Sequence, residues 1–127
     1  MQELDDRWIL PLRGRSVIGI DWRASDLLLD LGNEHSILVG YGAHLTPGNG
    51  KADDPNFKPL TEWDRKVADE ALRSSIVSSV GFKSGTLRIR FNNGWGLVAR
   101  PIYKNSSAIV YAEGRVLWQQ TAVGGTV

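Results

Sequence analysis

The feature that most constrains the fold is a degenerate repeat, in which the hydrophobic pattern of one segment returns sixty residues later in the chain. The two copies span residues 12–39 and 72–99. The aligned apolar pairs include Ile20 with Val80, Leu29 with Ile89, Leu31 with Phe91 and Ile37 with Leu97. Few aligned residues are identical, so the shared pattern carries the information. A pattern that occurs twice predicts the same local structure twice.

Each copy predicts three antiparallel strands. The central stretch of each copy alternates apolar and mostly polar residues, with Leu28 as the apolar exception, which is typical of a half-buried strand. We therefore expect a core that includes Leu29, Leu31, Ile89 and Phe91. Gly32-Asn33 and Asn93-Gly94 follow these stretches, and such residues tolerate the positive φ of a tight hairpin. The flanking apolar runs supply the first and third strands.

Three further segments complete the prediction. Residues 108–112 and 115–119 predict a C-terminal hairpin that turns at Glu113-Gly114, and residues 124–127 are expected to fray. One helix is expected near residues 61–73, with Thr61 as its N-cap and an apolar stripe of Trp63, Val67 and Ala71. Residues 42–59, rich in Gly and Pro, read as a long loop.

These elements predict a single α+β domain over residues 1–127. It consists mostly of antiparallel β-sheet, formed by two pseudo-repeated three-stranded meanders and a C-terminal hairpin, with one helix packed on it. No long uncharged apolar run is present, so we expect no membrane span. Met1 to Asp6 is acidic and does not resemble a secretory signal, and cysteine is absent, so we expect a cytoplasmic protein.

The net charge of +1 hides an asymmetry between the two halves of the chain. Residues 1–70 hold thirteen acidic and eight basic side chains, whereas residues 71–127 hold one acidic and seven basic side chains. The asymmetry indicates either an anionic partner for the second half or two halves that attract each other inside one fold.

The candidate binding residues come from this charge pattern. Arg88 and Arg90 share the face opposite the apolar positions of their strand, and Arg115 is a further basic candidate for that surface. Under the sixty-residue offset Asp30 aligns with Arg90, so the equivalent face of the first copy, with Asp26 and Asp30, is acidic. The five residues are candidates for binding a charged protein partner. Because the two faces carry charges of opposite sign, they also allow a weak homo-oligomer.

Signals for catalysis, metals and cofactors are weak. Without cysteine there is no thiolate site, and no Gly-x-Ser-x-Gly elbow occurs. Gly48 to Ala52 resembles the end of a phosphate-binding loop, but Leu45 stands where its first Gly is required and Ala52 where Ser or Thr is required. His44 with Asp53 and Asp54 could ligate a metal only if the loop folded back. We expect no catalytic residue, metal or cofactor.

The opening Trp8-Ile-Leu-Pro-Leu-Arg-Gly-Arg-Ser-Val17 and the hairpin Thr86-Leu-Arg-Ile-Arg-Phe-Asn-Asn-Gly-Trp95 resemble a family of small bacterial proteins of unknown function. In that family a Leu-Pro-Leu-x-Gly-x-x-Val opening and a Leu-x-Phe-x-Asp/Asn-Gly hairpin recur. The resemblance covers most of residues 8–125. It implies the two-meander fold, and it implies no activity.

Three functions remain open. The first is a non-catalytic domain that binds a protein partner, of an accessory or immunity type, and an exposed apolar patch would favour it. The second is a nucleic-acid-binding module that uses the basic second half, and a continuous basic groove would favour it. The third is a small-molecule site at the 42–59 loop, and a pocket around His44 would favour it.

Overall fold

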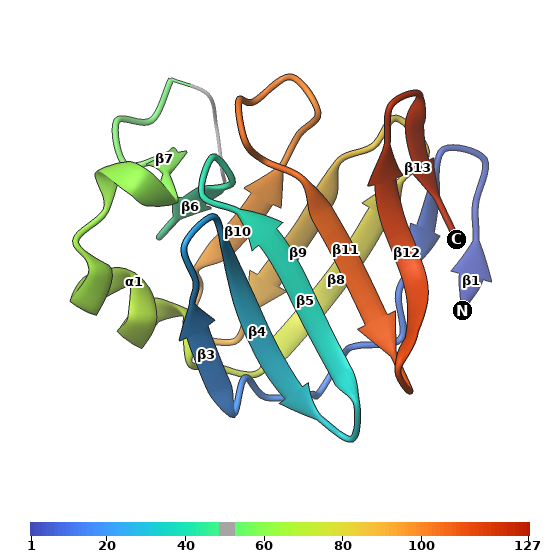
Figure 1. Ribbon diagram of the computed structural model, residues 1–127, viewed down its shortest axis with the longest axis horizontal. Helices are drawn as coiled ribbons and strands as arrows, with labels where there is room; N and C mark the ends of the chain where they lie inside the picture. The colour runs from blue at the N-terminus through green and yellow to red at the C-terminus, as the bar shows by residue number, and fades with distance from the viewer. Residues whose placement is uncertain (49–52) are drawn as a thin grey trace.

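Two antiparallel sheets packed face to face form the protein, with one short helix at one end (Figure 1). The computed structural model describes residues 1–48 and 53–127. Figure 1 shows α1 beside β3, while both chain termini lie at the opposite end. The predicted fold class, mostly antiparallel β with one helix, is confirmed.

The first sheet has seven strands, in the spatial order β1 (Gln2–Glu3), β2 (Arg7–Ile9), β8 (Ile76–Phe82), β9 (Leu87–Phe91), β10 (Gly96–Ala99), β6 (His44–Thr46) and β7 (Lys58–Pro59). The second sheet has six strands, in the order β13 (Gly124–Thr126), β12 (Arg115–Thr121), β11 (Ala108–Ala112), β5 (His35–Gly40), β4 (Asp26–Gly32) and β3 (Gly19–Trp22).

The two copies of the sequence pattern form one meander in each sheet. The first copy gives β3-β4-β5, and the second gives β8-β9-β10. The first turn lies one residue later than predicted: Gly32 ends β4 opposite His35, and Asn33 and Glu34 form the turn with positive φ. In the second meander Gly94 has positive φ and Asn93 does not. Glu113 and Gly114 also have positive φ, as the predicted C-terminal hairpin requires.

The core lies between the sheets. Leu29, Leu31, Ile89 and Phe91, which alternation assigned to the inner faces, are 0, 4, 0 and 2% exposed. Trp118 on β12 is the largest of the fully buried side chains. The strand parity inferred from the sequence is therefore correct in both meanders.

The helix differs from its prediction in its start and in its buried face. Residues Leu60–Glu62 form a 3₁₀ turn, and α1 runs only from Arg65 to Leu72. Asp64 replaces Thr61 as the N-cap, because its carboxylate accepts hydrogen bonds from the backbone N–H groups of Lys66 and Val67. With this later start Ala68, Ala71 and Leu72 are buried, while Val67 is 42% exposed.

Two segments expected to lack regular structure contain strands. The described part of 42–59 forms β6 and β7, and β6 pairs with β10 through Leu45 opposite Leu97. Residues 124–126 form β13 on the edge of β12 instead of fraying, and the Gly125 N–H also donates to the Lys83 carbonyl of the other sheet. In the described residues no helix is long and apolar enough to cross a membrane.

Candidate functional site

Two adjoining pockets lie at the end of the sandwich that carries α1, and they share Tyr41 and Thr61. The first has a volume of about 380 Å³ and is lined by Tyr41, Gly42, His44, Pro59, Thr61, Tyr103, Lys104 and Asn105. The second has a volume of about 220 Å³ and is lined by Trp22, Tyr41, Leu60, Thr61, Trp63 and Arg65. We call the surface formed by these residues the aromatic groove.

The groove forms where three segments distant in sequence meet. The Gly42 N–H donates to the Asn105 carbonyl at 2.7 Å, which joins the end of β5 to the β10–β11 loop. The Leu60 N–H donates to the Ala43 carbonyl at 2.9 Å, which joins the 3₁₀ turn to the same segment. A Cβ atom at Gly42 would lie 1.6 Å from the Lys104 carbonyl oxygen, so this approach requires glycine.

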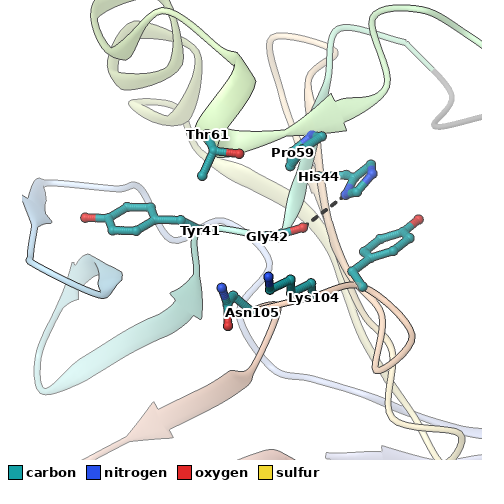
Figure 2. A pocket seen from close by; sticks show the side chains of 8 residues that line it. Tyr41, Gly42, His44, Pro59, Thr61, Lys104 and Asn105 are labelled. Carbon is teal, nitrogen blue, oxygen red and sulfur yellow. Dashed lines mark hydrogen bonds between the residues drawn. The ribbon is translucent and has the colours of Figure 1, made fainter.

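His44 and Tyr103 form one wall of the first pocket. Figure 2 shows His44 in this pocket, with Pro59 and Thr61 on one side of Gly42 and Lys104 and Asn105 on the other. The two rings stack with centroids 3.9 Å apart, and the His44 Nδ1 lies 3.1 Å from the Gly42 carbonyl oxygen. Burial lowers the pKa of His44, so its imidazole is neutral at pH 7. Burial also raises the pKa of the Tyr103 phenol, which stays protonated.

Trp22 and Tyr41 form the wall of the second pocket. Their ring planes are within 6° of parallel, with centroids 6.1 Å apart. The Trp22 indole N–H donates to Asp69 on α1 at 2.8 Å, and the Tyr41 hydroxyl donates to the Arg23 carbonyl. Burial raises the pKa of the Tyr41 phenol as well. Both rings are therefore held in place while remaining half-exposed, which suits binding without a large rearrangement.

The charged side chains that line the groove are cations. Lys104 lines the first pocket and Arg65 lines the second, whereas no carboxylate of the described residues lines either one. The Arg65 guanidinium lies 5.0 Å from the centroid of the Trp22 ring. Among the nearby carboxylates, Asp69 bonds Arg73 and Asp26 lies 3.0 Å from Arg23. Asp21 acts on Tyr41 and Glu62 on His44 through their charges, although neither lines a pocket.

The five charged residues proposed from the sequence do not form one site. Arg88 and Arg90 lie on β9 in the seven-stranded sheet, while Arg115, Asp26 and Asp30 lie in the six-stranded sheet. The Arg88 guanidinium lies 5.2 Å from the Phe82 ring centroid, and Arg90 donates to the Gly48 carbonyl at 2.6 Å. The Asp30 carboxylate accepts from the Gly32 N–H within its own turn. None of the five lines the aromatic groove.

The metal and phosphate hypotheses gain no support. No group of three His, Asp or Glu side chains within residues 1–48 and 53–127 is arranged to hold a metal ion. His44, the histidine of the hypothetical metal cluster, stacks on Tyr103 and lies 4.8 Å from Phe57 between ring centroids. Most of the loop that resembles a phosphate-binding motif, residues 49–52, lies outside the described residues.

Sequence reasoning missed most residues of the groove, above all Trp22, Tyr41, Tyr103 and Lys104. One signal was present in the tryptophan content. Five tryptophans are more than the core takes up, since only Trp118 is buried and the other four are half-exposed. The Gly40-Tyr41-Gly42 triplet was a second signal, because glycines on both sides of an aromatic residue indicate close backbone approaches.

Comparison with family models, with curated proteins and with solved structures gives no match to this chain. The resemblance to small bacterial proteins of unknown function, drawn from the residue 8–17 opening and the residue 86–95 hairpin, stays a prediction.

Proposed function

We propose that this chain is a non-catalytic domain that binds a protein partner, and that an extended segment of the partner lies in the aromatic groove. Such a domain would act in the cytoplasm as an accessory or immunity-type protein. The observation that carries the proposal is that two adjoining pockets share Tyr41 and Thr61 in their linings. Two adjoining pockets suit an elongated ligand, such as a peptide segment that places one side chain in each, better than a compact one.

The covered faces of the aromatic rings argue against a ligand that binds by stacking. His44 covers one face of the Tyr103 ring, and the Arg65 guanidinium lies against the Trp22 ring. Nucleobases stack on free aromatic faces. Each of these two rings therefore has one face in contact with a neighbour, which leaves less stacking surface for a nucleobase than an open aromatic platform offers.

A peptide-display selection tests the proposal. The immobilised protein is offered a random peptide library, in parallel with a Thr61→Trp variant that fills the groove from an exposed position. A Thr126→Trp variant, altered at an exposed position of β13, is the matched control. We expect the wild type and the control to enrich the same peptides and the Thr61→Trp variant to lose them. If Thr61→Trp keeps the same peptides, the groove is not the binding site.

Nucleic acid remains a second candidate because of one observation. Arg88 lies against Phe82 on the seven-stranded sheet, which combines a cation with an aromatic ring on one face. Binding to a nucleic acid backbone falls steeply with salt. We expect single-stranded oligonucleotides to bind poorly at about 0.15 M salt, where the Debye length is about 8 Å. Tight, salt-sensitive binding that an Arg88→Ala/Arg90→Ala variant loses would favour this second function.

The small-molecule alternative at the 42–59 loop is supported by one observation, since His44 lines a pocket. That pocket shares Tyr41 and Thr61 with the one lined by Trp22 and Arg65, and two adjoining pockets favour the longer ligand.

A further inference from the structure

We infer that the partner's segment also pairs with the free edge of β3 as an added strand, and that it places a basic residue opposite Asp21. This inference rests on the proposed function, because it takes the ligand of the aromatic groove to be an extended protein segment. It adds how the segment is held and which residues it carries. An extended segment can join an exposed sheet edge through main-chain hydrogen bonds, while its alternate side chains give specificity.

β3 is the last strand on its side of the six-stranded sheet (Figure 1). The Arg23 N–H donates to the Asp26 carbonyl at 3.0 Å, beside the end of the strand. Hydrogen-bonded pairs alternate with non-bonded pairs in an antiparallel ladder, so the backbone groups of Asp21 face β4, and those of Ile20 and Trp22 face outward. Among the described residues, no hydrogen bond outside the ladders uses the backbone groups of Ile20 or Trp22.

The other three sheet edges offer fewer free backbone groups. A ladder repeats its bonds at every second residue, so an edge needs two alternate outward residues to repeat a pair of bonds. In the described residues each of the other edge strands turns only one residue outward. That residue is Glu3 on β1, Pro59 on β7, which has no N–H, and Gly125 on β13, whose N–H donates to the Lys83 carbonyl. The edge of β3 is therefore the one best suited to an added strand.

The side chains of β3 specify what the added strand carries. Ile20 and Trp22 lie on the core side and are half-exposed, so apolar residues opposite them would bury more apolar surface. Asp21 is exposed on the outer face, where Asp30, opposite Gly19, lies diagonal to it. Neither carboxylate has an ion-pair partner in the described part of the chain. A segment that alternates apolar residues with Lys or Arg complements this edge.

The other charges around β3 are already in contact with neighbours. Arg23 lies 3.0 Å from Asp26, at the turn between β3 and β4. On the core side, Arg65 lies 5.0 Å from the Trp22 ring centroid, and Asp69 accepts from the Trp22 indole N–H. These contacts from α1 reach the Trp22 side chain and not its backbone groups. Asp21 therefore sets the charge that the outer face of the added strand meets.

A second copy of this chain fits the same edge less well. If both Ile20 and Trp22 pair across a two-fold axis, each Ile20 lies opposite a Trp22 and the two Asp21 residues face each other. Like charges directly opposite destabilise a strand pair. A register centred on Ile20 would need the Ile18 N–H, which already donates to Asp30, and one centred on Trp22 would extend into the turn before β4. A segment of a different protein is therefore the occupant.

A charge-reversed variant tests the residue pattern. A random peptide library is selected against the wild type, an Asp21→Lys variant and an Asp5→Lys variant, which makes the same charge change at an exposed position between β1 and β2. We expect the wild type and the Asp5→Lys control to enrich Lys or Arg alternating with apolar residues, and Asp21→Lys to enrich Asp or Glu in their place. A peptide selected by the wild type should bind Asp21→Lys about fivefold more weakly, since an exposed ion pair becomes repulsive.

Amide hydrogen exchange reports the added strand directly. In the free protein the Asp21 N–H, which is in the ladder with β4, should exchange slowly, and the Ile20 and Trp22 N–H groups should exchange fast. A selected peptide should slow the exchange of both. N-methylation of that peptide, one residue at a time, should weaken binding about tenfold or more at every second position only, because alternate N–H groups face β3.

The outcomes separate this inference from the proposed function. If Thr61→Trp abolishes binding of the selected peptides, but they leave Ile20 and Trp22 exchange fast or Asp21→Lys keeps the wild-type preference, the inference is wrong and the proposed function stands. If peptides slow that exchange and Thr61→Trp still binds them, the added strand stands and the groove assignment fails. If no peptide is enriched, both fail. Slow exchange that appears as the concentration of the protein alone rises would make a second copy the occupant and overturn the inference. Far-UV circular dichroism of each variant confirms that it remains folded.

Discussion

Replacing Gly42 by Ala should open the groove, because the two segments that form its floor touch at this glycine. The added Cβ would lie 1.6 Å from the Lys104 carbonyl oxygen and 2.8 Å from the Lys104 carbonyl carbon. Both are backbone atoms, so no change of rotamer relieves the clash. The φ of Gly42 is not in the left-handed region, so the expected effect is steric and carries no conformational penalty for Ala.

The magnitude follows from the contacts that must change. To reach ordinary van der Waals contact at 3.4 Å, the backbone at Lys104 must move by about 1.8 Å. Such a movement stretches the Gly42 to Asn105 hydrogen bond, now 2.7 Å, beyond bonding range. Overpacking costs about 1–3 kcal/mol and a lost hydrogen bond about 0.5–1.5 kcal/mol. We therefore expect a loss of about 2–4 kcal/mol in the free energy of unfolding.

Urea unfolding of Gly42→Ala measures this loss, and Gly19→Ala is the matched control. Gly19 lies in β3, its φ is also outside the left-handed region, and its Cβ would be 3.6 Å from the Asp30 Cβ, an ordinary contact. The control should change stability by less than about 0.5 kcal/mol. NMR provides the local readout, because His44 ring protons should lose the ring-current shift that Tyr103 imposes. If Gly42→Ala matches the control in stability and keeps that shift, the close approach is not real.

Three further perturbations test the core, the helix and the pocket. Phe91→Ala should lower the unfolding free energy by about 3–5 kcal/mol in urea titrations, since the side chain is 2% exposed, and Phe91→Leu should cost less. Asp64→Ala should cost about 0.5–2 kcal/mol by the same measurement, whereas Asp64→Asn, which keeps the cap acceptor, should cost little. Because the pKa of His44 is lowered from 6.5 by burial, the unfolded chain binds more protons below pH 6.5, so acidification from pH 7.5 to 5.5 should lower thermal stability. His44→Phe should weaken that pH dependence, and an equal slope in both proteins would contradict it.

The strands could be predicted because their cause is local. Alternation of apolar residues assigns Leu29 and Ile89 to inner faces whatever the neighbouring strands are. The turns are indicated by glycine and asparagine, because these residues tolerate positive φ. The pairing of the first meander with the C-terminal hairpin, through β5 beside β11, has no local signal. It depends on which edges remain free once the meanders have formed.

The helix boundary shows how a local signal can be read wrongly. Thr61 and Asp64 are both suitable caps, and the three-residue spacing between them is that of a capping box. The 3₁₀ turn at Leu60–Glu62 uses Thr61, so the α-helix starts after Asp64. This shift moves Val67 to the solvent and Ala68 to the core. Tertiary hydrogen bonds, from the Leu60 N–H to the Ala43 carbonyl and from the Thr61 N–H to the Tyr41 carbonyl, hold the 3₁₀ turn in place, and the local sequence does not encode them.

Most of the groove escaped prediction because, apart from Trp22 on β3, its residues come from segments that the repeat does not contain. The repeated meanders supply matching inner faces, and such faces are occupied by core packing. Tyr41, Thr61 and Arg65 lie in the connection between the copies, and Tyr103 and Lys104 lie in the loop after the second copy. Each is positioned by backbone contacts between these connections, such as Gly42 with Asn105.

Because the repeated strands mainly form the core and the connections mainly form the groove, the binding residues proposed from charge are scattered. Arg90 and Asp30 were paired by the repeat, and the repeat places its two copies in different sheets of the sandwich, so aligned residues are necessarily separated. Residues that act on one ligand must instead converge at one end of the sandwich, where the connections between the meanders meet. Loops on a rigid scaffold commonly carry function for this reason. A search for the binding site of such a chain should therefore begin with the segments that interrupt its repeat.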